Sequence, residues 1–239
     1  MPEFIDVFHY PREKDSFSRP EILQHFLQEL AAQGYYLARD EQEEVSKDPG
    51  PSDPARLFVP GVSQALWQEV ERFRQGEINE LSIVIYSAVR EGEVRGVEYR
   101  VTLYPKAELI RAVMDDIYPD SQPYRRFLDL LELLYNTWHP IFGYRDDGVR
   151  PGTDLEDART GNIVWLYDIN VWGPELVEHM GRERVLRTPA WRLTTLQDGG
   201  VLIVPQLYYS DGQAGEYTCT GDDAARHLGL HWEPPDERS

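Results

Sequence analysis

Apolar side chains repeat at helical intervals along several stretches of the chain. The stretch from Ser18 to Gly34 opens with the spacing of a capping box, Ser18-Arg19-Pro20-Glu21, and then carries an apolar residue at every turn until the glycine. A helix is therefore expected there. The same periodicity predicts further helices over residues 63–75, 109–117, 124–138, 174–181 and 222–228. The apolar arc of 124–138 is too broad for a surface helix, so we expect this helix in the core.

Other stretches alternate between apolar and polar residues, as half-buried strands do. Residues 81–89 and 97–104 read as an antiparallel hairpin, and 191–196 and 201–205 as a second one around Asp198-Gly199-Gly200. A further strand is expected over 162–172, and loops over 40–54 and 140–161. Paired strands with helices between them favour an α+β fold, with one or more antiparallel sheets built from hairpins and packed against several helices.

Length and composition suit a folded protein that needs no covalent support. The 239 residues are 41% hydrophobic, which is enough for one globular domain over 1–239; the alternative is two closely packed halves, 1–105 and 106–239. A single cysteine fits a reducing compartment. No export signal opens the chain and no apolar run could span a bilayer, so we expect a cytoplasmic protein with no membrane partner.

The charge balance restricts the class of partner. Lys and Arg number 24 against 42 Asp and Glu, a formal net charge of −18. Binding to a nucleic-acid backbone is electrostatically disfavoured, so no nucleic-acid partner is expected. A basic or neutral macromolecule is the expected partner, although many acidic proteins are simply soluble. The sequence leaves the oligomeric state open.

Signals for catalysis are weak. The chain has neither a glycine-rich phosphate loop nor a nucleophile elbow. His227 with His231 has the spacing of two zinc ligands, and Glu175 with His179 that of an acid–base pair, but a frayed segment and a surface ion pair explain these equally well. We therefore expect no metal, cofactor or catalytic residue. The alternative is an enzyme of unknown reaction whose site gathers four residues at the junction of the core helix and the second sheet: His139, Asp146, Asp147 and Asp168.

Two acidic stretches and one tryptophan form the candidate partner-binding surface. The first stretch lies in the predicted loop 40–54 and the second in the loop 140–161, although a solvated loop is the ordinary interpretation of such charge. Trp172 falls on the opposite strand face from Trp165 and Tyr167, so it is expected to point outward as a partner anchor. The candidate residues are Glu41, Glu43, Glu44, Asp48, Asp146, Asp147, Asp154, Glu156, Asp157 and Trp172.

About a third of the chain, all in its second half, resembles a known class of bacterial proteins. The matching segments are Tyr135-Asn136, Pro140-x-x-Gly143-Tyr144, 167–177, 181–184, 189–191 and 198–202. They resemble the immunity proteins of polymorphic-toxin systems. The resemblance implies a cytoplasmic antidote that neutralises a cognate toxin by direct binding, and the acidic composition indicates a basic toxin. It does not imply which toxin; a scaffold with another partner is a third interpretation.

Overall fold

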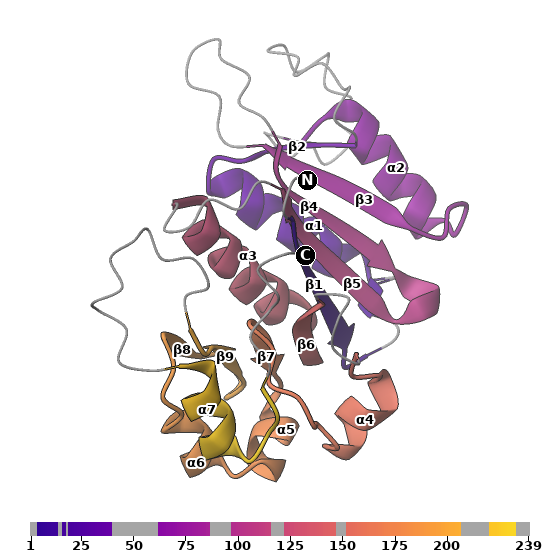
Figure 1. The fold of residues 1–239 in the computed structure, drawn as a ribbon. Coiled ribbons are helices and arrows are strands. Elements are labelled where there is room, and N and C mark those ends of the chain that lie inside the picture. The colour runs from indigo at the N-terminus through magenta and orange to yellow at the C-terminus, as the bar shows by residue number, and fades with distance from the viewer. Residues whose placement is uncertain are drawn as a thin grey trace. The chain divides into compact units, whose positions relative to one another are not determined.

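The computed structural model describes most of the chain, which falls into two compact units (Figure 1). Unit 1 is Met1–Arg12 with Asp116–Ser239, and unit 2 is Glu13–Asp115. The described residues are 4–13, 16–17, 19–39, 62–86, 97–115, 122–146, 152–206 and 220–232. Both units combine helices with antiparallel strands, which confirms the predicted α+β class. None of the described helices is long and apolar enough to cross a membrane.

Unit 2 is an antiparallel sheet with two helices. Its strands are ordered β2-β3-β4-β5. The elements are α1 (Pro20–Ala32), β2 (Tyr36–Ala38), α2 (Gln64–Arg74), β3 (Leu81–Tyr86), β4 (Val97–Tyr104), a 3-10 turn η2 (Pro105–Ala107) and β5 (Leu109–Asp115). The predicted hairpin is confirmed by the β3–β4 pairing, in which Ile83 lies opposite Val101. Helix α2 begins at Ser63, whose side chain accepts from the Leu66 amide.

One prediction for unit 2 is wrong and another is not tested. Helix α1 has Arg19 as its N-cap, without a side-chain hydrogen bond, and Pro20 in its first turn; Ser18, where the capping box was expected to begin, lies outside the described residues. The segment predicted as the helix 109–117 is strand β5. Ile110, Ala112 and Met114 are buried on one face of β5, and Val113 is buried on the other. A strand buried on both faces carries a continuous apolar run, which spacing alone does not distinguish from a helix.

Unit 1 holds five strands in the order β1-β6-β7-β9-β8 among its described residues. Its elements are β1 (Phe4–Pro11), α3 (Gln122–Trp138), β6 (Pro140–Asp146), α4 (Leu155–Thr160), β7 (Asn170–Trp172), α5 (Pro174–His179), α6 (Arg182–Leu186), β8 (Arg192–Thr195), β9 (Val201–Val204) and α7 (Gly221–Leu228). The β8–β9 hairpin and the helices α3, α5 and α7 confirm their predictions.

The middle of unit 1 differs from the sequence-based expectation. The predicted loop 140–161 contains strand β6 and helix α4, and the predicted strand 162–172 is regular only over β7. Asp154 caps α4 by accepting from the Asp157 amide at 2.8 Å, and Gly161 ends the helix at a φ of 74°. The missed elements are short, and their acidic or glycine-rich composition is also that of a surface loop.

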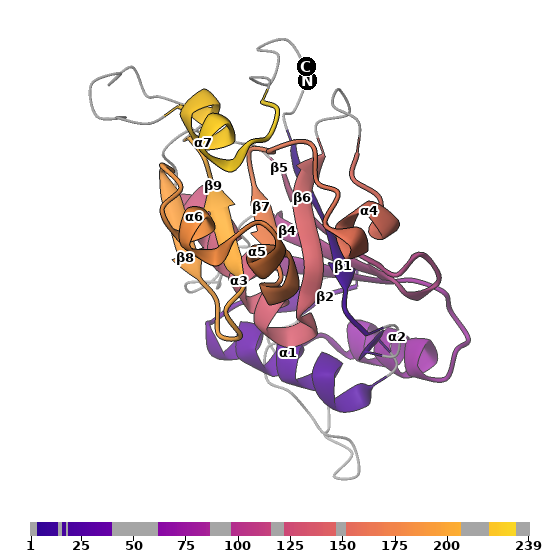
Figure 2. The same ribbon diagram turned by 90° about the horizontal axis from the view of Figure 1, so that it is seen from below.

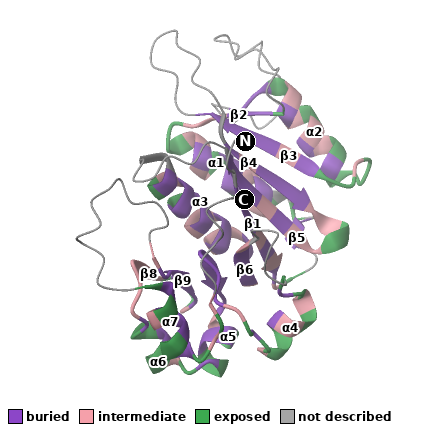
Figure 3. Ribbon diagram, viewed as in Figure 1, coloured by how far each residue is buried: buried purple, intermediate pink, exposed green. Residues whose placement is uncertain are grey.

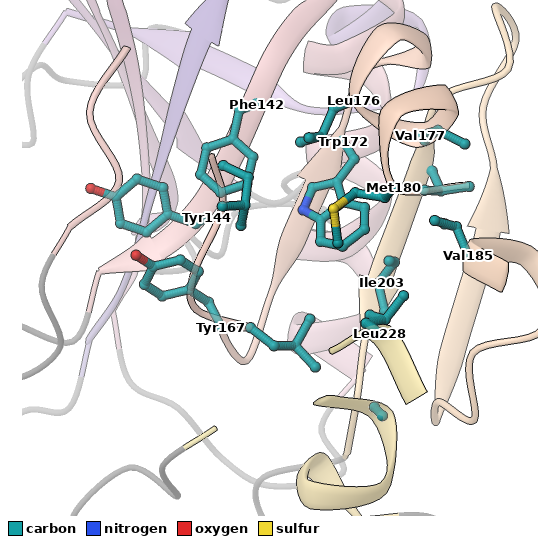
Figure 4. Close-up of a cluster of buried hydrophobic side chains, with 14 of the residues drawn as sticks. Phe142, Tyr144, Tyr167, Trp172, Leu176, Val177, Met180, Val185, Ile203 and Leu228 are labelled. Atoms are coloured by element: carbon teal, nitrogen blue, oxygen red, sulfur yellow. The ribbon is translucent and has the colours of Figure 1, made fainter. Parts of the chain in front are cut away.

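Helices cover both faces of the unit 1 strands. Helix α3 lies on one face and helices α5 and α6 on the other (Figure 2). The second face carries a cluster of buried side chains, in which Phe142 and Trp172 pack with residues of α5, α6 and α7 (Figure 4). Strands and inner helix faces are buried, while the outer faces of α6 and α7 are exposed (Figure 3). The strands of this unit therefore have no face open to solvent along β7 and β9.

Candidate functional site

The prediction that Trp172 points outward is wrong. Its side chain is fully buried, and it pairs with Phe142 on β6 and Val201 on β9 in the cluster beneath α5. The alternation predicted along 162–172 is also wrong, because only Asn170–Trp172 is strand, and Trp165 and Tyr167 lie in the same cluster as Trp172. All three residues of β7 are buried, so alternation does not separate inside from outside there. Trp172 belongs to the core and leaves the candidate partner surface.

A polar network centred on Asp198 lies at one end of the unit 1 strands. The Tyr135 hydroxyl donates to Asp198 Oδ1 at 2.5 Å, and the Gly200 amide donates to the same oxygen at 3.0 Å. The other carboxylate oxygen lies 3.5 Å from the Arg12 guanidinium and 3.6 Å from His139 Nδ1. The network thus joins the end of β1, helix α3 and the β8–β9 turn.

Glu175 extends this network to helix α5. Its carboxylate accepts from Arg12 Nη2 at 2.9 Å, so Arg12 lies between two acidic groups on different elements. The Glu175 side chain is 65% exposed, whereas that of Asp198 is 22% exposed. Asp198 is therefore the inner member of the pair and Glu175 the one presented to solvent.

Glycines allow the backbone to approach closely enough for this network. A Cβ added to Gly200 would lie 2.0 Å from the Tyr135 hydroxyl and 2.6 Å from the Trp172 carbonyl oxygen. A Cβ at Gly173 would lie 2.9 Å from the Pro140 carbonyl oxygen. Gly199 adopts a φ of 90°, which suits the tight turn. A larger residue at 200 would push the turn away from α3, and one at 173 would push the start of α5 away from β6.

The electrostatics of the network fix its protonation. Partial burial acts to raise the pKa of Asp198, but hydrogen bonds from Tyr135 and the Gly200 amide, with the charges of Arg12 and His139, outweigh it and lower that pKa. Burial and the neighbouring Asp198 carboxylate raise the pKa of Tyr135 well above its ordinary value. An ionised acceptor and a protonated donor persist at neutral pH. General acid–base catalysis needs pKa values close to the working pH, so this pair is suited to holding structure.

His139 and Asp168, two of the four residues of the enzyme alternative, do not converge as predicted. His139 directly precedes β6 and lies beside Asp198, whereas Asp168 pairs with Arg145 at 2.8 Å near the other end of that strand. The distance from Pro140 to Arg145 along a strand is about 17 Å. Asp146 is the last residue of β6, and Asp147 lies outside the described residues. The site predicted around His139 and Asp168 is therefore not assembled.

The two histidine pairs noted in the sequence are also separated. His227 Nε2 lies 2.8 Å from the Arg184 carbonyl oxygen, while the His231 ring lies against that of Trp165 in a tilted arrangement, with 5.4 Å between the ring centroids. Glu175 pairs with Arg12, whereas His179 packs against Gly161. Among the described residues, no group of three or more His, Cys, Asp or Glu side chains is placed to hold a metal ion.

Helix α4 carries the described part of the predicted acidic surface. Asp154 caps the helix, Glu156 is exposed, and Asp157 accepts from the Asn162 side-chain amide at 2.9 Å. A Cβ at Gly161 would meet the His179 ring at 2.6 Å, so the end of α4 is seated against α5. The helix therefore presents its carboxylates from a fixed position. Of the remaining acidic candidates, Asp146 ends β6, and Glu41, Glu43, Glu44, Asp48 and Asp147 lie outside the described residues.

Sequence reasoning missed the role of Arg12, Tyr135 and Asp198. Tyr135 and Asp198 both lie in the segments that carry the resemblance, and an Asp-Gly-Gly turn was recognised. Nothing in the spacing indicates that a helix 63 residues earlier supplies the hydroxyl for that carboxylate. The sequence offered one indication of their pairing, which is that Tyr135 and Asp198 both lie in segments that resemble the same class of proteins.

No protein-family model and no curated protein matches the chain. Among solved structures, the chain is similar to a T6SS protein of Pseudomonas aeruginosa, PA0821, with a TM-score of 0.45 and 14% sequence identity over 99% of this chain and 77% of that one. The function of this chain is therefore inferred from its own residues.

Proposed function

We propose that this protein is a cytoplasmic immunity protein that neutralises a basic toxin by binding it directly through an acidic surface. The formal net charge of −18 supports a partner of positive charge. The resemblance in the second half of the chain supports the class of immunity proteins. Complementary charge raises the rate of encounter between two proteins and rejects partners of the wrong sign. The antidote acts by occupying the toxin and performs no reaction of its own.

One observation carries the proposal: the residues of the resembling segments form a rigid framework in unit 1. Tyr135, Gly173, Glu175, Asp198 and Gly200 come together in one network and its close backbone contacts. The pKa values of Tyr135 and Asp198 are both displaced away from neutrality. Such a framework supports a preformed binding surface, which saves the cost of ordering on association.

The acidic helix α4 is the part of this surface that the structure describes. Asp154 and Glu156 are exposed, and the hydrogen bonds of Asp154 and Asp157 hold the helix without any bound partner. Carboxylates fixed in this way resemble the anions that a basic toxin cleft attracts. The proposed toxin contact is therefore α4, together with the other acidic candidates that the sequence analysis names.

Growth rescue tests the proposal. The protein is co-expressed with the toxin encoded beside its gene, and survival is compared for the wild type and the D154N/E156Q variant. Asparagine retains N-capping ability, so this variant removes charge from α4 without removing its cap. The control variant E21Q/E80Q neutralises two exposed carboxylates of unit 2. Rescue by the wild type and the control, with weaker rescue by D154N/E156Q, is expected; full toxicity despite good wild-type expression would contradict the proposal.

A further inference from the structure

A basic pocket lies between helices α6 and α7, in contrast to the acidic character of the chain. Its volume is about 590 Å³, within the usual range for small-molecule sites. The lining residues are Gly181, Arg182, Glu183, Arg184, Arg187 and His227. We propose that this pocket binds the phosphate group of a small molecule, an activity that goes beyond the proposed toxin binding and does not depend on it.

Two of the three lining arginines form no ion pair with a carboxylate that the structure describes. Among the described residues, no Asp or Glu oxygen lies within ion-pair distance of Arg184 or Arg187. The Arg184 guanidinium instead donates to the Met180 carbonyl oxygen, through Nε at 2.9 Å and through Nη2. Arg182 differs, because Glu178 pairs with it and it also donates to the Gly199 carbonyl oxygen at 3.1 Å. Within the described part of the chain, Arg184 and Arg187 thus bring positive charge to the pocket that no ion pair neutralises.

The walls of the pocket are fixed relative to each other. His227 on α7 donates through Nε2 to the Arg184 carbonyl oxygen on α6, at 2.8 Å. Beneath the pocket, Val185 and Leu228 are buried in the same apolar cluster. Gly181 adopts a φ of 88° and joins α5 to α6 in a conformation that other residues rarely take. Arg184 and His227 are therefore held in place before any ligand arrives, whereas the Arg187 side chain is exposed.

Arginine chemistry indicates the ligand class. A guanidinium offers a planar fork of donors that matches the oxygens of a phosphate, and each such charge-assisted contact is stronger than a neutral hydrogen bond. Glu183, the one carboxylate among the described lining residues, opposes anions in general but not enough to cancel Arg184 and Arg187 together. The same chemistry fits free inorganic phosphate and the phosphate of an organic molecule, so the test contains both.

Calorimetric titration of the full-length protein tests the proposal, with inorganic phosphate in one arm and adenosine monophosphate in the other, in a low-salt buffer. Variant R187Q removes an exposed guanidinium that forms no ion pair with any described carboxylate, and R184Q/R187Q removes the positive charge of both arginines. The matched control is R226Q, because Arg226 is exposed on α7 and pairs with Asp223 outside the pocket lining. The three variants are first compared with the wild type by thermal unfolding.

Binding of either probe is expected to weaken about tenfold in R187Q and further in R184Q/R187Q, and to be almost unchanged in R226Q. Tighter binding of the nucleotide would identify an organic phosphate as the ligand, and equal binding would identify the free ion. Two results would overturn the proposal. One is the absence of binding to the wild type by both probes at about 10 mM. The other is an equal loss of affinity in R187Q and R226Q, which would mean that only the net charge of the protein, and not the pocket, determines binding.

Discussion

The Tyr135 hydroxyl and the Asp198 carboxylate are joined by a 2.5 Å hydrogen bond that links helix α3 to the β8–β9 turn. Asp198 raises the pKa of Tyr135 and so keeps the hydroxyl protonated as a donor. Tyr135 lowers the pKa of Asp198 and so keeps the carboxylate ionised as an acceptor. The bond therefore persists across the neutral range. It ties two segments that are remote in the sequence into one support for unit 1.

Removal of either partner should destabilise the protein to a similar extent. Y135F leaves the carboxylate without its main donor, and D198N removes the charge that this donor faces; each is expected to cost about 2 kcal/mol in the free energy of unfolding. The double variant should cost less than the sum of the two, because both changes break the same bond. Urea denaturation followed by tryptophan fluorescence measures all four proteins. Additive losses would mean that the two groups do not interact.

Gly200 should resist even the smallest substitution. A Cβ at this position would overlap the Tyr135 hydroxyl and the Trp172 backbone, so G200A is expected to cost about 3 kcal/mol through overpacking. Gly229 provides the control, since it has a φ of 78° but no atom within 4 Å of the Cβ that an alanine would add. G229A should therefore cost only the backbone strain, about 1 kcal/mol. Equal losses in thermal stability would show that packing around Gly200 is loose.

Substitution of Trp172 tests whether this residue belongs to the core or is a surface anchor. The fully buried indole predicts that W172A costs about 3–5 kcal/mol in unfolding free energy. L186A is the control, because Leu186 is 40% exposed, and its cost should stay within about 0.5 kcal/mol. Chemical denaturation measures both. A W172A protein of wild-type stability would restore the surface position that strand alternation had suggested.

His9 predicts a specific pH dependence of stability. Its side chain is fully buried, neither ring nitrogen has a hydrogen-bond partner among the described residues, and burial lowers its pKa from 6.5 to about 3. Between these two values the unfolded chain binds a proton that the folded chain does not. The contribution of His9 to the unfolding free energy is therefore independent of pH above pH 6.5. Below pH 6.5 it falls as the pH drops, by at most about 1.4 kcal/mol per pH unit.

The variant H9L should lose this component of the pH dependence. As the pH falls from 6.5 towards about 4, the wild type should lose more unfolding free energy than H9L does. This holds whatever the difference in stability between the two proteins above pH 6.5. H25Q serves as the control, because the His25 side chain is 62% exposed, and it should keep the wild-type slope. Parallel pH profiles for H9L and the wild type would mean that His9 becomes protonated without unfolding.

The sequence predicted elements with a clear period or a glycine turn well, and elements that are very short or buried on both faces poorly. Helix α3 and the β3–β4 and β8–β9 hairpins were recognisable because each has a clear period or a glycine turn. Strand β5 was mistaken for a helix because both of its faces are buried. Helix α4 is a single capped turn and a half in an acidic segment, so its composition resembled that of a loop.

The candidate site was less predictable than the fold, for a physical reason. Asp198 depends on donors from three other elements, and only tertiary structure brings Arg12, Tyr135 and His139 to it. The pocket between α6 and α7 likewise depends on two segments 43 residues apart at the His227–Arg184 contact. Local patterns carry the sign of the charge on each segment but not which segments meet.

The rate of association with the toxin, measured against ionic strength, tests the central claim most directly. Exposed charges are screened beyond about 8 Å at physiological salt, so an encounter steered by acidic groups slows as salt is added. We predict a steep fall in the wild-type association rate with salt, and for D154N/E156Q a lower rate at low salt and a shallower fall. An association rate that is independent of salt, or identical slopes for the wild type and D154N/E156Q, would contradict toxin binding through the acidic surface on α4.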